Sequence, residues 1–577
     1  MTRLIVVSLT SLLFACSDPA SLPPPPVDDT KLMLPTPAGP HAIGVVDFEL
    51  VDNNRDETFA PGEPRRIPVR AWFPASSVSG DPKLYASAQE IEHVIRGFSA
   101  VVPQTEESIA ARKNLPTHSY GQAVPLTQGP RPTVIFSHGG FGYLGSNTAL
   151  MEHLASHGYL VLSISHPYLS AATIHENGEV IAFNQGLLDG MMAAVTAPES
   201  TYLDGFLSPD VAVRLEESLR NQEFFALAPH FKIWQKDFMH VIDRLESGDV
   251  PGKASKLLPL VDLSRLGVFG MSFGASGSAT AHQDARIKAA INLDGGVFDS
   301  ALVDMDIGIP VLVMHNDPAL AGMPSPPFPH SEFVYEPLAT MGTNPDIIRV
   351  ETKGATHMAY TDNVLLPASV RAAAPDGGAS LGTIDGPRMG EIMNQFVLRF
   401  FDYYLSGEGP GLDATFRAQY PEVIDLDFAH VRDYAAGNPE PGFMSQTHVF
   451  QMNRRLAVDE ASKAAAARLD RTYIMAYELT DSLRGGTEWW QLTFDPESGL
   501  SFSLDAPEVT PDLTFGGEYS EYIRFMKSLA AGEASEEAQP LTVSGDPGML
   551  ETVGEAFAAG RAAATIKTVM PALQQRE

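Results

Sequence analysis

The sequence predicts an α/β protein with a mostly parallel sheet, followed by a smaller C-terminal α+β domain. Short apolar runs alternate with stretches of helical spacing, a pattern typical of a parallel sheet that is covered on both faces. The chain has 577 residues, of which 44% are hydrophobic, so it can bury a large core. The pattern changes near residue 440, where a Pro- and Gly-containing break precedes alternating strands.

The larger domain is expected to span residues 41–440. Its predicted strands are 41–50, 66–73, 133–136, 159–165, 266–269, 289–293, 310–314 and 347–352, and Asn53-Asn54 is expected to form the first turn. Helices are expected at 148–157 and 232–245. Residues 168–230 fit this alternation poorly and are expected to form a long insertion, such as a lid or substrate-binding cap.

The smaller domain is expected to span residues 441–577. An alanine-rich helix is predicted at 461–469. Residues 490–494 and 500–504 alternate apolar and polar side chains around a turn, which predicts a β-hairpin, and 519–529 is an amphipathic helix.

The charge of the chain excludes one class of partner. There are 39 Lys and Arg residues against 71 Asp and Glu residues, a net charge of −32. Such a surface repels phosphates, so no nucleic-acid partner is expected. The sequence has no H-E-x-x-H or C-x-x-C motif, no phosphate-binding loop with a lysine and no dinucleotide fingerprint. We therefore expect neither a metal nor a cofactor, and nothing in the sequence indicates an oligomeric state.

The N-terminal residues 1–16 have the features of an export signal. Arg3 precedes the apolar run 4–15, which is too short to remain as a membrane span, and small Ala15 precedes Cys16, the single cysteine of the chain. This segment resembles the lipobox of bacterial lipoproteins. The resemblance implies that Cys16 carries acyl chains that anchor the mature protein in the cell envelope, facing the periplasm or exterior. Residues 17–40 are proline-rich and are expected to be a spacer.

The pentapeptide Gly270-Met271-Ser272-Phe273-Gly274 lies between the predicted strand 266–269 and a run of small residues. In that strand–turn–helix context, G-x-S-x-G predicts a nucleophile elbow, with Ser272 exposed at the carboxyl end of the sheet. An acyl-transfer serine needs N–H donors for the oxyanion. Phe273 is expected to provide one, and Gly140, in the glycine-rich loop 137–142, is the candidate for the other.

The base is expected to follow the last strand. His357 lies shortly after strand 347–352, in the order nucleophile, acid, histidine that this elbow fold uses, and it is favoured over His315 and His330. Two residues are candidates for the acid. Asp294 follows strand 289–293 and Asp317 follows strand 310–314, and spacing alone leaves the choice between them open.

The motifs FSHGGFG, GMSFGASG, INLDGG and KGATH, in this order, resemble the platelet-activating factor acetylhydrolase and lipase-like branch of the α/β hydrolases. The resemblance covers about residues 65–404 and implies the α/β-hydrolase fold. It also implies that Asp294 is the acid, and that Gly140 and Phe273 are the oxyanion donors. The chain departs from the family at Met271, where members often have histidine. Asp317 lies where the wider superfamily keeps its acid.

The smaller domain has a resemblance of its own. The segments Trp489-Trp490-Gln491-Leu492, Thr510–Thr514, 519–529 and Leu541–Asp546 resemble a sterol-carrier-protein type lipid-transfer domain. That resemblance implies an apolar tunnel for acyl chains or sterols. The alternative is a small α+β domain whose apolar residues only fill a core.

These observations predict a serine carboxylic-ester hydrolase for lipid-like or other apolar esters, acting through Ser272, His357 and Asp294 and an acyl-enzyme. One alternative is a non-catalytic lipid carrier in which the hydrolase domain is only a scaffold. The other is a dienelactone-type hydrolase of soluble esters.

Overall fold

The computed structural model describes residues 31–100, 102, 104–196, 204–224, 227–321, 331–437, 440–482, 486–533 and 540–571. Cys16 and the signal segment lie outside the described residues. The chain divides into two compact units, one made of residues up to 209 and 221–433, the other of 210–220 and the residues from 434 onward. The expected boundary was 440/441, and residues 210–220 come from the expected insertion.

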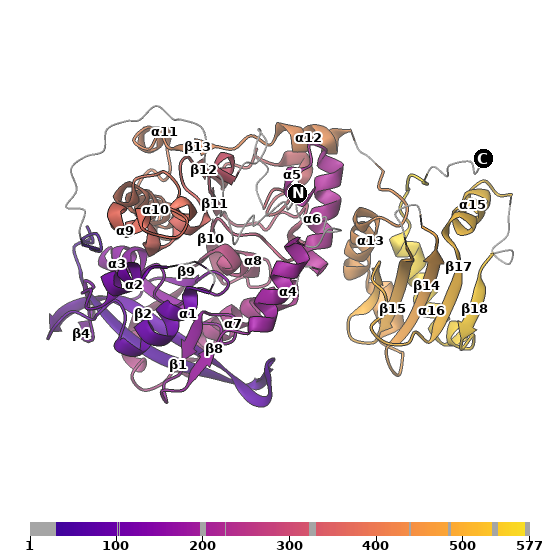
Figure 1. Cartoon of the computed structure of the whole chain (residues 1–577). Coiled ribbons are helices and arrows are strands. Elements are labelled where there is room, and N and C mark those ends of the chain that lie inside the picture. The colour runs from indigo at the N-terminus through magenta and orange to yellow at the C-terminus, as the bar shows by residue number, and fades with distance from the viewer. Residues whose placement is uncertain are drawn as a thin grey trace. The chain divides into compact units, whose positions relative to one another are not determined.

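The first unit is built on an 11-stranded sheet (Figure 1). The strand order is β13-β12-β11-β10-β9-β5-β6-β2-β1-β3, with β4 paired to β2. The six strands from β12 to β6 run parallel to one another. β13 is antiparallel to β12, β2 is antiparallel to β6 and β1, and β3 is parallel to β1. The prediction of a mostly parallel sheet is thereby confirmed.

The strands of this sheet have the following bounds: β1 (Ala42–Glu57), β2 (Ala60–Ser79), β3 (Ser119–Tyr120), β4 (Gln122–Pro125), β5 (Arg131–Ser137), β6 (Leu160–Ile164), β9 (Val261–Met271), β10 (Ile287–Leu293), β11 (Val311–His315), β12 (Ile347–Thr352) and β13 (Val423–Asp425). Most side chains of β5, β6, β10 and β11 are buried, which is the reason the sequence shows continuous apolar runs there.

The first hairpin is longer than expected. The turn lies at residues 58–59, and Asn53-Asn54 is part of β1 instead. The Arg55 side chain donates to Asp52 and, at 2.7 Å, to the buried Asp237. The prediction of a turn at Asn53-Asn54 is therefore wrong: local turn preference is overridden by these ion pairs, which keep the strand extended beyond it.

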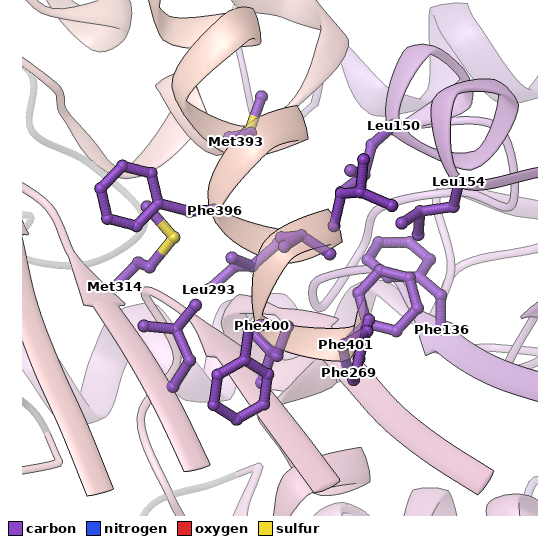
Figure 2. Close-up of a cluster of buried hydrophobic side chains, with 14 of the residues drawn as sticks. Phe136, Leu150, Leu154, Phe269, Leu293, Met314, Met393, Phe396, Phe400 and Phe401 are labelled. Carbon is purple, nitrogen blue, oxygen red and sulfur yellow. The ribbon is translucent and has the colours of Figure 1, made fainter. Parts of the chain in front are cut away.

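Helices cover both faces of the sheet (Figure 1). The helices are α1 (Arg96–Phe98), α2 (Glu106–Arg112), α3 (Thr148–Ser156), α7 (Ala228–Ser247), α8 (Ser276–Thr280), α9 (Ala368–Ala372), α10 (Gly386–Phe401), α11 (Ala414–Arg417) and α12 (Ala429–Ala436). Figure 2 shows how α10 packs: Phe396, Phe400 and Phe401 contact apolar side chains of α3 and of the strands. Asp385 caps the N-terminus of α10, and its side chain accepts from the Arg388 N–H.

The predicted insertion 168–230 contains a small hairpin and several helices. Its described elements are β7 (Ala172–Ile174), β8 (Val180–Ala182), α4 (Gln185–Thr196), α5 (Asp204–Leu207), α6 (Val211–Phe224) and the start of α7. That content explains why the segment does not follow the alternation of strand and helix in the rest of the unit. Whether it acts as a lid stays a prediction.

The second unit has a five-stranded sheet of order β16-β15-β14-β17-β18. Its elements are α13 (Gln446–Val458), α14 (Glu460–Ala466), β14 (Tyr473–Thr480), β15 (Glu488–Asp495), β16 (Gly499–Ser503), β17 (Leu513–Glu518), α15 (Tyr519–Ala530), β18 (Thr542–Gly545) and α16 (Met549–Ala564). Within this unit Glu216 accepts the backbone N–H groups of Gln446 and Thr447 and so caps α13. The unit has the expected hairpin and α+β composition.

Within the described part of the chain, no helix is both long and apolar enough to cross a membrane. The same residues contain no cluster of His, Cys, Asp and Glu side chains that would hold a metal ion.

Candidate active site

The sharp turn after β9 presents Ser272. Its backbone has φ 56°, a left-handed conformation that is strained for a serine, and a short 3₁₀ turn (Ser272–Ala275) leads from it into α8. A Cβ on Gly270 would lie 2.0 Å from the Gly274 carbonyl oxygen, and one on Gly274 would lie 2.2 Å from the Ser137 carbonyl oxygen. Both flanking residues must therefore be glycine. This is the geometry of a nucleophile elbow.

His357 is the first residue of a short 3₁₀ turn after β12, and its side chain contacts Ser272. Its Nε2 lies 2.8 Å from the Ser272 Oγ, within hydrogen-bond distance. The ring is almost fully buried, whereas the serine side chain is partly exposed. A general base must be within this reach of the proton it removes. The structure thus brings together the two residues that the sequence proposed as nucleophile and base.

Asp294 lies on the other side of His357. Its Oδ2 is 2.6 Å from the His357 Nδ1, and the aspartate is fully buried. The backbone of Asp294 has φ 54°, which turns this side chain at the end of β10. Asn316 donates to both carboxylate oxygens, from its backbone N–H at 2.8 Å and from its side-chain amide at 2.9 Å. Asp294 is thereby held toward the histidine.

Asp317 has a different set of partners. It accepts the backbone N–H groups of Gly354 (2.9 Å) and Ala319 (3.1 Å), and the Lys353 ammonium lies 3.6 Å away. These bonds brace the loop that carries His357. No hydrogen bond joins Asp317 to His357 within the described residues. Of the two candidate acids, the geometry brings Asp294 to the histidine.

The loop 137–142 lies directly beside the elbow. A Cβ on Gly139 would be 2.9 Å from the Ser272 Cβ, so only glycine allows this approach. A Cβ on Gly140 would lie 3.5 Å from the Phe273 Cβ, which puts the two candidate oxyanion donors next to each other. Among the described residues the Gly140 N–H has no acceptor.

His138 fixes the peptide that precedes Gly140. Its Nδ1 donates to the Gly139 carbonyl oxygen at 2.7 Å, and the Gly142 N–H donates to the same oxygen at 2.8 Å. Burial lowers the pKa of His138 to about 3, so the ring is neutral at neutral pH. Because the C=O and N–H of a trans peptide point in opposite directions, this arrangement orients the Gly140 N–H. It agrees with a bracing role for His138 rather than that of a base.

Two residues around the site had not been singled out from the sequence. Asn316 supports Asp294, and His166 contacts the end of β5. The signal that points to both is their position: each is a polar residue within two residues of the end of a buried parallel strand, at the edge of the sheet where Ser272 lies.

Comparison with known proteins shows similarity to one family and, among others, to two esterases. Residues 28–183 match the family model described as platelet-activating factor acetylhydrolase, isoform II. The chain is 23% identical over 462 residues to a probable 1-alkyl-2-acetylglycerophosphocholine esterase of Arthroderma benhamiae, a match that covers 73% of this chain and 98% of the relative. A ferulic acid esterase from Streptomyces cinnamoneus is 22% identical, with a TM-score of 0.47, over 69% of this chain and 99% of that structure.

The matched family segment includes the loop 137–142 and ends before Ser272. The sheet order, the elbow after β9 and the order of serine, aspartate and histidine along the chain are those of the α/β-hydrolase fold. The predicted fold class is confirmed.

Proposed function

We propose that this chain, a carboxylic-ester hydrolase, cleaves lipid-like or other apolar esters through a Ser272–His357–Asp294 triad. The observation that carries the proposal is the unbroken series of short contacts from Ser272 through His357 to Asp294 at a strained elbow. A neutral imidazole that donates Nδ1–H to an aspartate presents Nε2 as the base for the serine hydroxyl.

The mechanism follows from this arrangement. His357 removes the proton of Ser272 as its Oγ attacks the ester carbonyl, and Asp294 stabilises the imidazolium that forms. The N–H groups of Gly140 and Phe273 stabilise the negative charge on the carbonyl oxygen. The protonated His357 then gives its proton to the leaving alcohol. Water, activated by the same histidine, attacks the acyl-serine and releases the acid, which restores the free serine.

The substrate class is proposed on two grounds. The relative from Arthroderma benhamiae is described as an esterase of an acetylated ether phospholipid. In this chain, Phe231, Phe273 and Phe298 form an aromatic cluster beside the nucleophile, with ring centroids 5.2–5.8 Å apart. Phe231 and Phe273 are buried and Phe298 is partly exposed, so Phe298 is the member of this cluster that an acyl chain would contact. We expect short acyl chains on phospholipids or acylglycerols to fit there better than charged soluble esters.

Turnover of the purified chain on p-nitrophenyl esters from acetate to palmitate, on a 2-acetyl ether phospholipid and on a soluble lactone tests this proposal. We expect hydrolysis of the phospholipid and of apolar acyl esters, with Ser272→Ala as the inactive control. A chain that hydrolyses only soluble lactones would favour the dienelactone-type alternative. A chain that hydrolyses none of these esters while still binding lipid would favour the carrier alternative.

The second unit offers a separate binding function. It contains a cavity of about 530 Å³, whose lining is mostly aromatic and aliphatic and includes Trp490, Phe515 and Met475. This volume is in the range of small-molecule sites. The cavity favours the sterol-carrier-like interpretation over a filled core, and we propose that it takes a single acyl chain or a sterol.

Tryptophan fluorescence tests the cavity. Trp489 and Trp490 are consecutive in β15, so their side chains point to opposite faces of the sheet, and Trp490 lines the cavity. A brominated fatty acid is expected to quench the fluorescence of the full chain. The quenching should be lost in Trp490→Phe and kept in Trp489→Phe. Equal quenching in both variants would contradict binding in this cavity.

A further inference from the structure

A second series of Asp, His and Ser side chains lies beneath the oxyanion loop. The Ser137 Oγ is 2.9 Å from the His166 Nε2, and the His166 Nδ1 is 2.7 Å from the Asp237 Oδ2. All three residues are fully buried. No substrate can reach Ser137, so this series does not serve as a second active site.

The charges around Asp237 determine which atom donates in each bond. Burial alone would raise the pKa of Asp237, but its ion pairs with Arg65 and Arg55 hold it well below the ordinary range. Burial lowers the pKa of His166 to about 4. A neutral His166 therefore donates from Nδ1 to the ionised Asp237, and its Nε2 accepts the hydroxyl proton of Ser137.

Ser137 contacts both segments that carry the oxyanion donors, the loop with Gly140 and the elbow with Phe273. It is the last residue of β5 and the first of the loop that carries Gly140. Its carbonyl oxygen is in such close contact with the elbow that a Cβ on Gly274 would lie 2.2 Å from it. A displacement of Ser137 would thus change both the loop and the turn that presents Phe273.

Trp234 contacts both His166 of this series and Phe273, whose N–H is the second oxyanion donor. Its ring stacks on His166 with centroids 3.7 Å apart and an interplanar angle of 9°. It also contacts the Phe273 ring edge-on at 4.8 Å. Trp234 and Asp237 are three residues apart on α7 and so lie on one face of that helix.

We propose that Asp237 and His166, with Trp234, are positioning residues that hold Ser137 and thereby set the distance between the Gly140 and Phe273 N–H groups. This inference rests on the proposed function, because it assigns these N–H groups to the oxyanion of an ester bound at Ser272. None of the three residues touches the substrate, and their effect on the reaction is exerted through the loop and the elbow.

The test compares Ser137→Ala, His166→Asn and the double variant. Asn at 166 keeps a donor near the Nδ1 position for Asp237 but is too short to reach Ser137. The matched control is His175→Asn. His175 is also buried, and its Nδ1 lies 2.6 Å from a carboxylate oxygen of Glu49. Glu49 in turn pairs with Arg66, as Asp237 pairs with Arg65. The active sites of each variant are counted by titration with an organophosphonate. Activity on a p-nitrophenyl ester is then expressed per titrated site, so that misfolded protein does not enter the comparison.

We expect kcat per titrated site to fall about 10- to 100-fold in both single variants, with KM nearly unchanged, because misplaced donors weaken transition-state binding. The inhibition constant of a trifluoromethyl ketone should rise by a similar factor. The double variant should be no slower than the slower single variant, since both break one series. His175→Asn should retain the parent kcat per titrated site.

Parent values of kcat in Ser137→Ala and His166→Asn would overturn the proposal, as would independent, additive losses. An equal loss in His175→Asn would overturn it too, because a general effect on stability would then explain the data. Should His166→Asn yield no titratable protein, Ser137→Ala, which removes only a hydroxyl, decides the question alone. Residual turnover in Ser272→Ala would instead overturn the proposed function, so the two failures are distinguishable.

Discussion

At the scale of single residues, the site depends on which of two aspartates faces His357. Asp294 and Asp317 follow neighbouring parallel strands, so both are at the same edge of the sheet. Which one faces His357 depends on the backbone angle φ 54° at Asp294 and on the support from Asn316. Neither feature can be read from spacing, whereas Ser272 and His357 could be proposed from motif context and chain order.

The residue-scale prediction is that Asp294→Asn loses about 10³- to 10⁴-fold in kcat, because an amide neither stabilises the imidazolium nor keeps the required tautomer. Asp317→Asn should keep near-parent kinetics. It should lose only about 1–2 kcal/mol of stability, since it weakens two backbone hydrogen bonds. Both variants are assayed on one ester, with urea unfolding as the stability measurement. If Asp317→Asn is the inactive variant, the assignment of Asp294 is wrong.

At the scale of elements, the sequence locates the strands whose own residues determine them. It misplaces a turn whose position depends on an ion pair between residues that are distant in the sequence. Strands 133–136, 266–269 and 289–293 were found because buried parallel strands are apolar without interruption. The first turn was wrongly placed at Asn53-Asn54, because Arg55 pairs with Asp237, which is far away in the sequence. The hairpin of β15 and β16 was found because its turn and its alternation agree.

The element-scale prediction concerns Asp362, which accepts the Ala149 N–H in the first turn of α3. Burial raises the pKa of Asp362 to about 8, although that N–H bond opposes the shift. Between its unfolded pKa of about 4 and pH 8, only the folded chain keeps this proton. The contribution of Asp362 to stability is therefore fully present below about pH 4 and is lost as the pH rises to 8.

The asparagine of Asp362→Asn stays neutral at every pH. The free energy of unfolding of the parent should therefore fall relative to that of the variant as the pH rises from 5 to 8. Urea titration measures both values. Asp376→Asn is the control. The Ser380 hydrogen bonds lower the pKa of Asp376 against the effect of burial, so its contribution changes only at acidic pH. A constant difference between parent and Asp362→Asn over this range would contradict the assignment.

At the scale of the whole molecule, the second unit is not contiguous in the sequence. Residues 210–220 belong to it together with the residues from 434 onward, and Glu216 caps α13 within it. Composition and periodicity identify contiguous segments, so the sequence indicated a break near 440 and gave no sign that part of the insertion belongs to the second unit.

The prediction at this scale concerns Cys16, which we propose as the acylated anchor residue in the cell envelope. In a bacterial host, Cys16→Ala should release the full-length chain from the membrane fraction or block its cleavage, because the buried methylenes of the acyl chains hold it there. Fractionation and N-terminal mass analysis measure this. Unchanged membrane association with normal cleavage would rule out the lipobox.

The central claim is that Ser272 forms an acyl-enzyme. The most direct test is mass analysis of peptides from chain quenched with acid during turnover of p-nitrophenyl acetate. We predict the mass of one acetyl group on the peptide that contains Ser272, and no adduct on that peptide in Ser272→Ala. An acetyl group found only on another residue, or turnover without any adduct at Ser272 under conditions where deacylation is slow, would contradict the account.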